Sequence, residues 1–114
     1  MASRSKPTCW EPTDALRARS PERLLAALAR FMLASEPNAE RDYRDVLVGF
    51  APYLDCARRL GSDPVDLFDT AAADAGPAVR ELAAAFARRS AVTLRDFGWR
   101  LDQTPDGPCY KPTG

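Results

Sequence analysis

Three regularly spaced aspartates form the clearest group of side chains that could do chemistry. Asp63, Asp66 and Asp69 recur every three residues, and Asp74 follows them, so the first three are expected near one face of a helix. Such carboxylates could bind a divalent cation or a basic partner. Asp63 and Asp66, however, fall in the first turn of the predicted helix, where the helix dipole stabilises each carboxylate by about 0.3–1 kcal/mol. Because the sequence offers no further ligands for a cation beside these carboxylates, it predicts no metal site. This acidic face is then a candidate for partner binding.

The absence of histidine limits the catalytic chemistry open to this chain. The sequence contains no histidine, which removes the commonest general base and the commonest transition-metal ligand. Its three cysteines, Cys9, Cys56 and Cys109, lie far apart and form no C-x-x-C pair, so neither a zinc site nor a dithiol redox motif is indicated. We therefore expect a protein that is not an enzyme, with no catalytic residues, no cofactor and no metal.

Aromatic residues near the two ends of the chain are the other candidates for binding. Trp10 follows a polar N-terminal segment, and Trp99 and Tyr110 flank a predicted turn. Aromatic side chains beside a polar rim are typical anchors of protein–protein contacts, although the same residues could form a small core. The predicted partner-binding residues are Trp10, Asp63, Asp66, Asp69, Trp99 and Tyr110.

The charge of the chain disfavours nucleic acid as its partner. Lys+Arg and Asp+Glu both total 16 and the formal net charge is zero, whereas polyanion binding needs an excess of cations on one surface. Residues 57–89 have the spacing of a helix-turn-helix, so a nucleic-acid-binding regulator that uses this segment is the alternative hypothesis. The helix after Gly61 would bring aspartates to the DNA, and helix dipoles account for the pairs Arg58-Arg59 and Arg88-Arg89 at predicted helix ends.

The elements that must position these residues begin with two helices. Ser20-Pro21 is a strong helix start, and Glu36-Pro37 ends that helix because the residue before proline avoids the α region. Asn38 is expected to cap a long helix that keeps one apolar face for several turns. Pro52 lies inside this helix and removes a backbone donor, so a kink is expected there, and Gly61 ends the helix.

Start signals also predict the helices of the second half. Ser62-Asp63-Pro64 and Gly76-Pro77 each open a helix. Thr93 and Asp96 have the spacing of a capping box, which predicts one last helical turn.

A dense turn signal predicts a hairpin at the end of the chain. Thr104-Pro105-Asp106-Gly107 places proline and glycine where a β-turn prefers them, between the segments 98–103 and 108–111. Two strands alone are marginally stable, so the hairpin is expected to pack on the helices through Trp99, Leu101 and Tyr110.

These elements predict a mainly α protein of one domain. We expect a bundle of four to five helices, one of them kinked at Pro52, with a C-terminal β-hairpin. The predicted organisation is a flexible leader over 1–12, a helical domain over 13–97, and a hairpin and tail over 98–114 packed on the same domain. The similar order of residues in 7–12 and 107–112 also suggests that the leader lies beside the hairpin, with Cys9 near Cys109.

The function predicted by elimination is that of a small protein-interaction module. A regulator, an adaptor or an immunity-type inhibitor would fit, and the abundance of alanine and arginine is typical of small bacterial proteins. The start of the chain lacks the apolar stretch of a signal peptide, and the apolar run 24–34 contains Arg30 and is shorter than the ~20 residues that span a bilayer. We therefore expect a cytoplasmic protein with another protein as its partner, away from the membrane, and homo-oligomerisation stays open.

Overall fold

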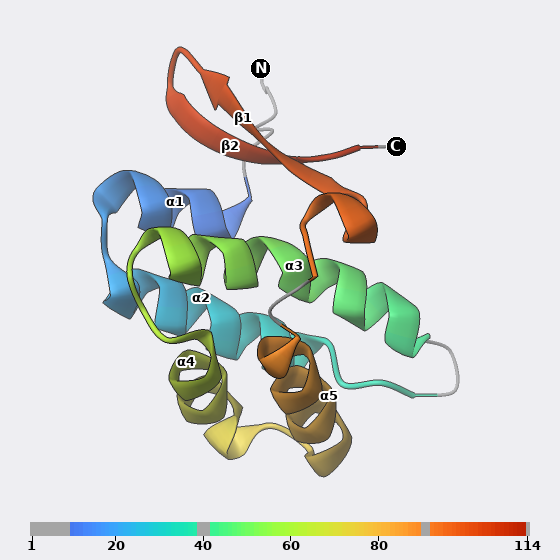
Figure 1. Cartoon of the computed structure of the whole chain (residues 1–114). Helices are drawn as coiled ribbons and strands as arrows, with labels where there is room; N and C mark the ends of the chain where they lie inside the picture. The colour runs from blue at the N-terminus through green and yellow to red at the C-terminus, as the bar shows by residue number, and fades with distance from the viewer. Residues whose placement is uncertain (1–9, 39–41, 90–91, 114) are drawn as a thin grey trace, which may run out of the picture.

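The computed structural model describes residues 10–38, 42–89 and 92–113. Five α-helices precede a C-terminal antiparallel hairpin (Figure 1), which confirms the predicted fold class. The elements are α1 (Glu11–Ala18), α2 (Pro21–Ala34), α3 (Tyr43–Arg59), α4 (Pro64–Ala71), the 3₁₀ turn η1 (Ala72–Asp74), α5 (Pro77–Arg88), the 3₁₀ turn η2 (Arg95–Phe97), β1 (Trp99–Thr104) and β2 (Gly107–Pro112).

Most helix starts follow the predicted local signals. Ser20 accepts a hydrogen bond from the backbone N–H of Arg23 at 3.2 Å, and Asp63 accepts one from that of Val65 at 2.9 Å, so each caps the helix that begins at the following proline. The predicted capping box before η2 is also present, because the backbone N–H of Asp96 donates to the Thr93 hydroxyl at 3.3 Å and the Asp96 carboxylate accepts from the Thr93 N–H at 3.4 Å.

Two helix starts differ from the sequence prediction. The prediction that Asn38 caps α3 is wrong: Asp42 occupies the cap and accepts from the Arg44 N–H at 3.0 Å. Both residue types are good caps, and the one that adjoins the first helical turn makes the bond.

α1 begins at Glu11, inside the segment 1–12 that the sequence predicts as a leader. α3 continues through Pro52 as one helix.

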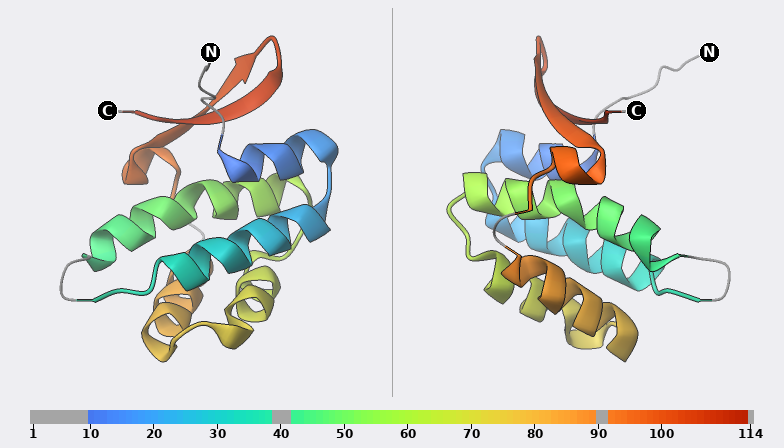
Figure 2. Two further views of the ribbon diagram at one scale, coloured as in Figure 1. Left: turned by 180° about the vertical axis from the view of Figure 1, so that it is seen from behind. Right: turned by 45° about the vertical axis from the view of Figure 1, so that its right-hand side comes forward.

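The elements form three layers around an antiparallel pair of helices (Figures 1 and 2). α2 and α3 lie side by side at the centre, with α1 and the hairpin on one side and α4 and α5 on the other. Phe50 of α3 lies within the core, with its ring centroid 5.4 Å from that of Phe68 and 6.1 Å from that of Phe86. The buried faces of the helices thus meet on α3, which supports the elements on both sides.

The hairpin has the predicted two-residue turn. Thr104 pairs with Gly107 across Pro105-Asp106, and the register runs to Trp99 opposite Pro112. Trp99 and Tyr110 are buried and Leu101 is half-buried, so the hairpin packs on the helices as expected. No helix in the described part of the chain is long and apolar enough to cross a membrane.

Candidate functional site

The two aromatic candidates of the hairpin belong to the core. The side chain of Tyr110 is fully buried, and Trp99 is 5% exposed. The phenol of Tyr110 donates a 2.9 Å hydrogen bond to Oδ2 of Asp55, which also receives Nε of Arg59 at 2.7 Å. These contacts join the hairpin to α3, and the two aromatic side chains are not accessible to a partner of the folded chain.

The same contacts keep the buried hydroxyl protonated. Burial, the adjacent Asp55 carboxylate and the nearby Cys56 all raise the pKa of Tyr110 well above its usual value. The hydroxyl therefore acts as a donor within the fold over the physiological range, and it holds Asp55 in place.

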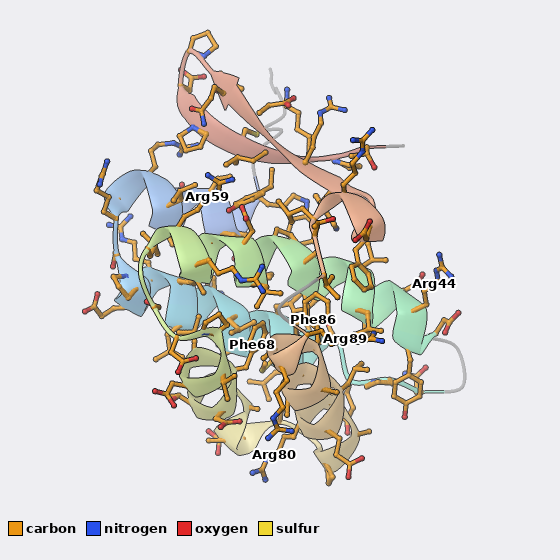
Figure 3. All side chains as sticks on the ribbon, viewed as in Figure 1. Arg44, Arg59, Phe68, Arg80, Phe86 and Arg89 are labelled. Atoms are coloured by element: carbon orange, nitrogen blue, oxygen red, sulfur yellow. The ribbon has the colours of Figure 1, made fainter. Side chains whose placement is uncertain are left out.

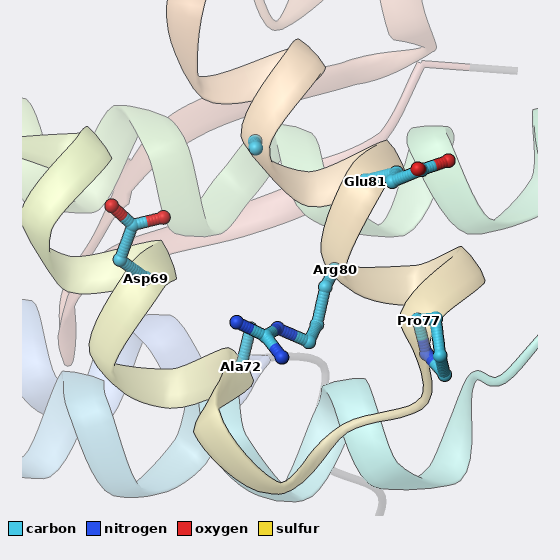
Figure 4. Close-up of a pocket in the computed structure, with 6 residues that line it drawn as sticks. Asp69, Ala72, Pro77, Arg80 and Glu81 are labelled. Atoms are coloured by element: carbon cyan, nitrogen blue, oxygen red, sulfur yellow. The ribbon is translucent and has the colours of Figure 1, made fainter.

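The three aspartates lie at the start and on the outer side of α4. Asp63 is the N-cap, Asp66 lies in the first helical turn, and all three are exposed. Asp69 lines a groove between α4 and α5, in which Arg80 reaches from α5 toward Ala72 (Figure 4). Within the described ranges, no cluster of three or more cysteine, aspartate or glutamate side chains could hold a metal ion.

Trp10 is the predicted candidate that lines an open, apolar groove. It lies immediately before α1, and its half-buried ring is 6.5 Å from that of Phe31 on α2 and 6.4 Å from that of Tyr53 on α3. Phe31 and Tyr53 stack on each other at 5.1 Å, with 27° between their planes. The groove is wide open to solvent, has a volume of about 490 Å³, and is completed by Ala34, Glu11 and Arg30. We call it the aromatic groove.

An ion pair lies at the rim of the aromatic groove. Arg30 donates from Nη2 to Oε1 of Glu11 at 3.1 Å, and both side chains remain more than half exposed. Burial raises the pKa of the Tyr53 phenol, and the nearby Glu11 carboxylate raises it further. The rim therefore presents one positive and one negative group beside three aromatic rings.

Several contacts hold the walls of the aromatic groove in place. The Trp10 ring packs edge-on against Trp99 at 4.4 Å. The thiol of Cys56 donates to the carbonyl of Pro12 at 3.3 Å, which ties the start of α1 to α3. Phe31 lies directly over Gly49, where a Cβ atom would come within 2.3 Å of its ring. The groove is thus built on packed helices, which favours a preformed binding site.

Comparison with known proteins adds no relative. No protein-family model matches the chain, and no curated protein and no solved structure is significantly similar to it. The assignment of a function therefore depends on the geometry of this chain.

The sequence predicts Trp10 as a binding residue and does not point to Phe31 and Tyr53, which line the same groove. Phe31 follows the apolar period of α2 and reads as a core residue, while Tyr53 lies between core positions of α3. The available signal was Gly49 in the middle of a helix, because a helical glycine often marks the close approach of another element. The second hypothesis about the N-terminal segment, that Cys9 lies near Cys109, falls outside the described residues.

Proposed function

We propose that this protein is a protein-interaction module whose aromatic groove takes up an apolar side chain from a partner polypeptide. The observation that carries the proposal is the open groove formed by Trp10, Phe31 and Tyr53. Its volume of about 490 Å³ lies within the range of roughly 300–1,000 Å³ typical of binding pockets. Rigid aromatic walls in such a setting are characteristic of the energetically important centres of protein interfaces.

The surroundings of the aromatic groove indicate the chemistry of the partner. Arg30 and Glu11 are 63% and 53% exposed at the rim, so a partner with one acidic and one basic residue beside its apolar anchor would complement them. The proposed occupant is therefore a segment of another protein in which a leucine-sized or larger apolar side chain is flanked by charged residues.

The buried ionisable groups support a binding role over a catalytic one. Burial raises the pKa of the Cys56 thiol to about 12, and the pKa values of Tyr53 and Tyr110 are raised as well. All three groups are therefore neutral donors at physiological pH, whereas a nucleophilic thiolate or a general base needs a pKa near the working pH. A regulator, an adaptor or an inhibitor remains our proposal, and bacterial origin and a cytoplasmic location stay predictions from the sequence.

The alternative of nucleic-acid binding receives no specific support. The exposed aspartates of α4 lie in the segment that would approach DNA, where they would repel the phosphates. A recognition helix normally brings arginine, lysine, asparagine or glutamine to the bases.

Selection of peptides provides the test. We would select short peptides from a random display library on the wild-type chain and measure their affinities by fluorescence anisotropy. Ala34→Lys should weaken the selected peptides by about tenfold or more, because a long charged side chain would stand at an exposed position in the groove wall. Ala26→Lys is the matched control, since it makes the same change at an exposed position of the same helix away from the groove.

The outcomes distinguish the groove from the rest of the surface. The proposal requires selected peptides that carry an apolar anchor, and retention of binding by Ala26→Lys. Peptides that bind Ala34→Lys as well as they bind the wild type would overturn it, as would the failure of any peptide to bind.

A further inference from the structure

A second groove lies at the C-terminal end of α1, and it combines arginines with leucines. It encloses about 360 Å³ where the ends of α1 and α3 meet the hairpin. Arg17 lines it from the last turn of α1, Arg19 from the residue that follows this helix, and Arg59 from α3. Half-buried Leu16, Leu60 and Leu101 form its apolar part. We call it the arginine groove.

The charges of the arginine groove are only partly balanced. Arg17 pairs with Asp14 at 3.1 Å and Arg59 with Asp55 at 2.7 Å, and neither pair exhausts the five N–H donors of a guanidinium. The side chain of Arg19 has no hydrogen-bond or ion-pair partner among the described residues. Among the described residues, the groove therefore holds one positive charge in excess, and its guanidinium groups keep unused N–H donors.

Arg19 occupies a backbone position where the chain elsewhere uses glycine. α1 and α3 end in the same motif: Ser20 N–H donates to the Ala15 carbonyl at 3.0 Å, as Ser62 N–H donates to that of Ala57 at 2.9 Å. The left-handed residue is Gly61 after α3, with φ of 77°, but it is Arg19 after α1, with φ of 53°. An arginine in this conformation is unfavourable for the fold, and an unfavourable backbone position at a groove is a recognised mark of a binding residue.

Arg17 is also held in place by the hairpin. Its side chain lies over Gly107, so closely that a Cβ atom there would be 3.2 Å from Nε. Gly107 has φ of 115° and closes the turn. The position of this guanidinium thus depends on the hairpin, and three elements together shape the groove.

We infer that the arginine groove binds an acidic polypeptide segment, in which a carboxylate meets Arg19 and an adjacent apolar side chain covers Leu16, Leu60 and Leu101. A single excess positive charge beside leucines matches a carboxylate next to an apolar residue. The C-terminal ends of α1 and α3, which carry partial negative charge, adjoin the groove. They oppose the single charge of a carboxylate less than the higher charge of a phosphate, so the attraction of an anion depends on the arginines. The arginine groove and the aromatic groove are separate sites, and this inference does not depend on the proposed function.

The test uses a labelled peptide of alternating glutamate and leucine, titrated with the full chain at low ionic strength and followed by fluorescence anisotropy. We expect saturable binding, and Arg19→Gln should raise Kd by about fivefold or more. Arg44→Gln is the matched control, because it removes the same charge from an exposed position at the opposite end of α3 from Arg59 (Figure 3).

Two further probes separate the chemistry of the ligand. The peptide of alternating glutamine and leucine and that of alternating glutamate and glycine should each bind more weakly, because each lacks one half of the proposed recognition. The inference is overturned if the glutamate and leucine peptide does not bind, or if Arg44→Gln weakens it as much as Arg19→Gln does. Tighter binding of a labelled oligothymidine that also depends on Arg19 would overturn it in favour of a nucleic acid.

Discussion

Arg19 shows how a single residue can separate stability from binding. The two helix ends that meet at the arginine groove share one backbone motif but differ in its left-handed residue, Arg19 in one and Gly61 in the other. Gly61 has open space around its missing side chain, so its presence there is explained by conformation alone. The same left-handed conformation at Arg19 lowers the free energy of unfolding, whereas a glycine at this position would adopt it without that loss.

Arg19→Gly should therefore stabilise the fold while weakening the binding of an acidic peptide. Relief of the left-handed conformation should outweigh the greater flexibility of glycine in the unfolded chain, so the free energy of unfolding should rise by about 0.5–1 kcal/mol. Urea denaturation followed by circular dichroism measures this change. Gly61→Arg makes the reverse change at the matching position and should destabilise by a similar amount; a loss of stability in Arg19→Gly would contradict the argument.

At the scale of elements, the acidic side chains of α4 have unequal roles. Asp63 accepts the backbone N–H of Val65 and Asp66 lies in the first turn, whereas Asp69 lies near the end of the helix. In the sequence the three aspartates form one cluster. In the structure only Asp63 and Asp66 lie where a carboxylate stabilises the start of the helix.

Asp63→Ala should accordingly lower the free energy of unfolding by about 1 kcal/mol, the usual effect of losing an N-cap. Asp69→Ala is the control of identical chemistry, and it should change stability by less than about 0.5 kcal/mol because it caps nothing. Thermal or urea denaturation of both variants provides the comparison. Equal losses in the two variants would indicate that the cluster acts through its summed charge.

The crossing of α2 and α3 depends on Gly49. An alanine would normally favour a helix over glycine by about 1 kcal/mol, yet a Cβ atom at this position would overlap the ring of Phe31. Gly49→Ala should thus destabilise the protein by about 1–3 kcal/mol, as is usual for overpacking. It should also disturb the Phe31–Tyr53 stack, visible as a change in near-ultraviolet circular dichroism. An increase in stability would show that Phe31 moves aside at little cost.

The elements whose boundaries depend on adjacent residues were predictable from sequence. Ser20-Pro21, Asp63-Pro64 and the Thr93–Asp96 pair each make their hydrogen bonds within three residues, so local sequence specifies them. The start of α3 was not predictable, because Asn38 and Asp42 are both suitable caps.

The candidate site was predictable only in part, because its contacts join distant segments. Tyr110 meets Asp55 across 55 positions of the chain, and Trp99 packs against Trp10. A pattern of residue types shows that these side chains are aromatic and does not show which of them become buried. Trp10 remained accessible and Trp99 did not, a difference that arises from packing of the hairpin on α1 and α3.

At the scale of the whole molecule, α3 joins the hairpin, α1 and the two outer helices. Cys56 on α3 and Tyr110 on β2 are buried donors that must stay protonated for their hydrogen bonds to form. The phenol of Tyr53, also on α3, is buried as well, and its pKa is raised. The thiol holds the start of α1, and the phenol of Tyr110 holds the hairpin. The free energy of unfolding of the whole protein therefore depends on the protonation of these buried groups.

This dependence predicts destabilisation in alkali. The pKa of Cys56 is about 12 in the folded chain against 9.0 for an unperturbed thiol, so the unfolded chain loses its proton first. The stabilisation from this group is complete below pH 9 and is lost as the pH rises toward 12, with a slope of about 1.4 kcal/mol per pH unit. Tyr53 and Tyr110, whose pKa values are also raised, should steepen the slope above about pH 10.

Urea denaturation at a series of pH values measures the effect, with Cys56→Ala as the comparison. This variant lacks the thiol, so its free energy of unfolding should fall less steeply than that of the wild type from about pH 9 up to about pH 12, while the tyrosines add the same slope to both proteins above about pH 10. Identical curves for the two proteins would show that Cys56 ionises as easily in the folded chain as in the unfolded one. Such a result would remove the thiol from the contacts that hold α1 on α3, and with it one support of the aromatic groove.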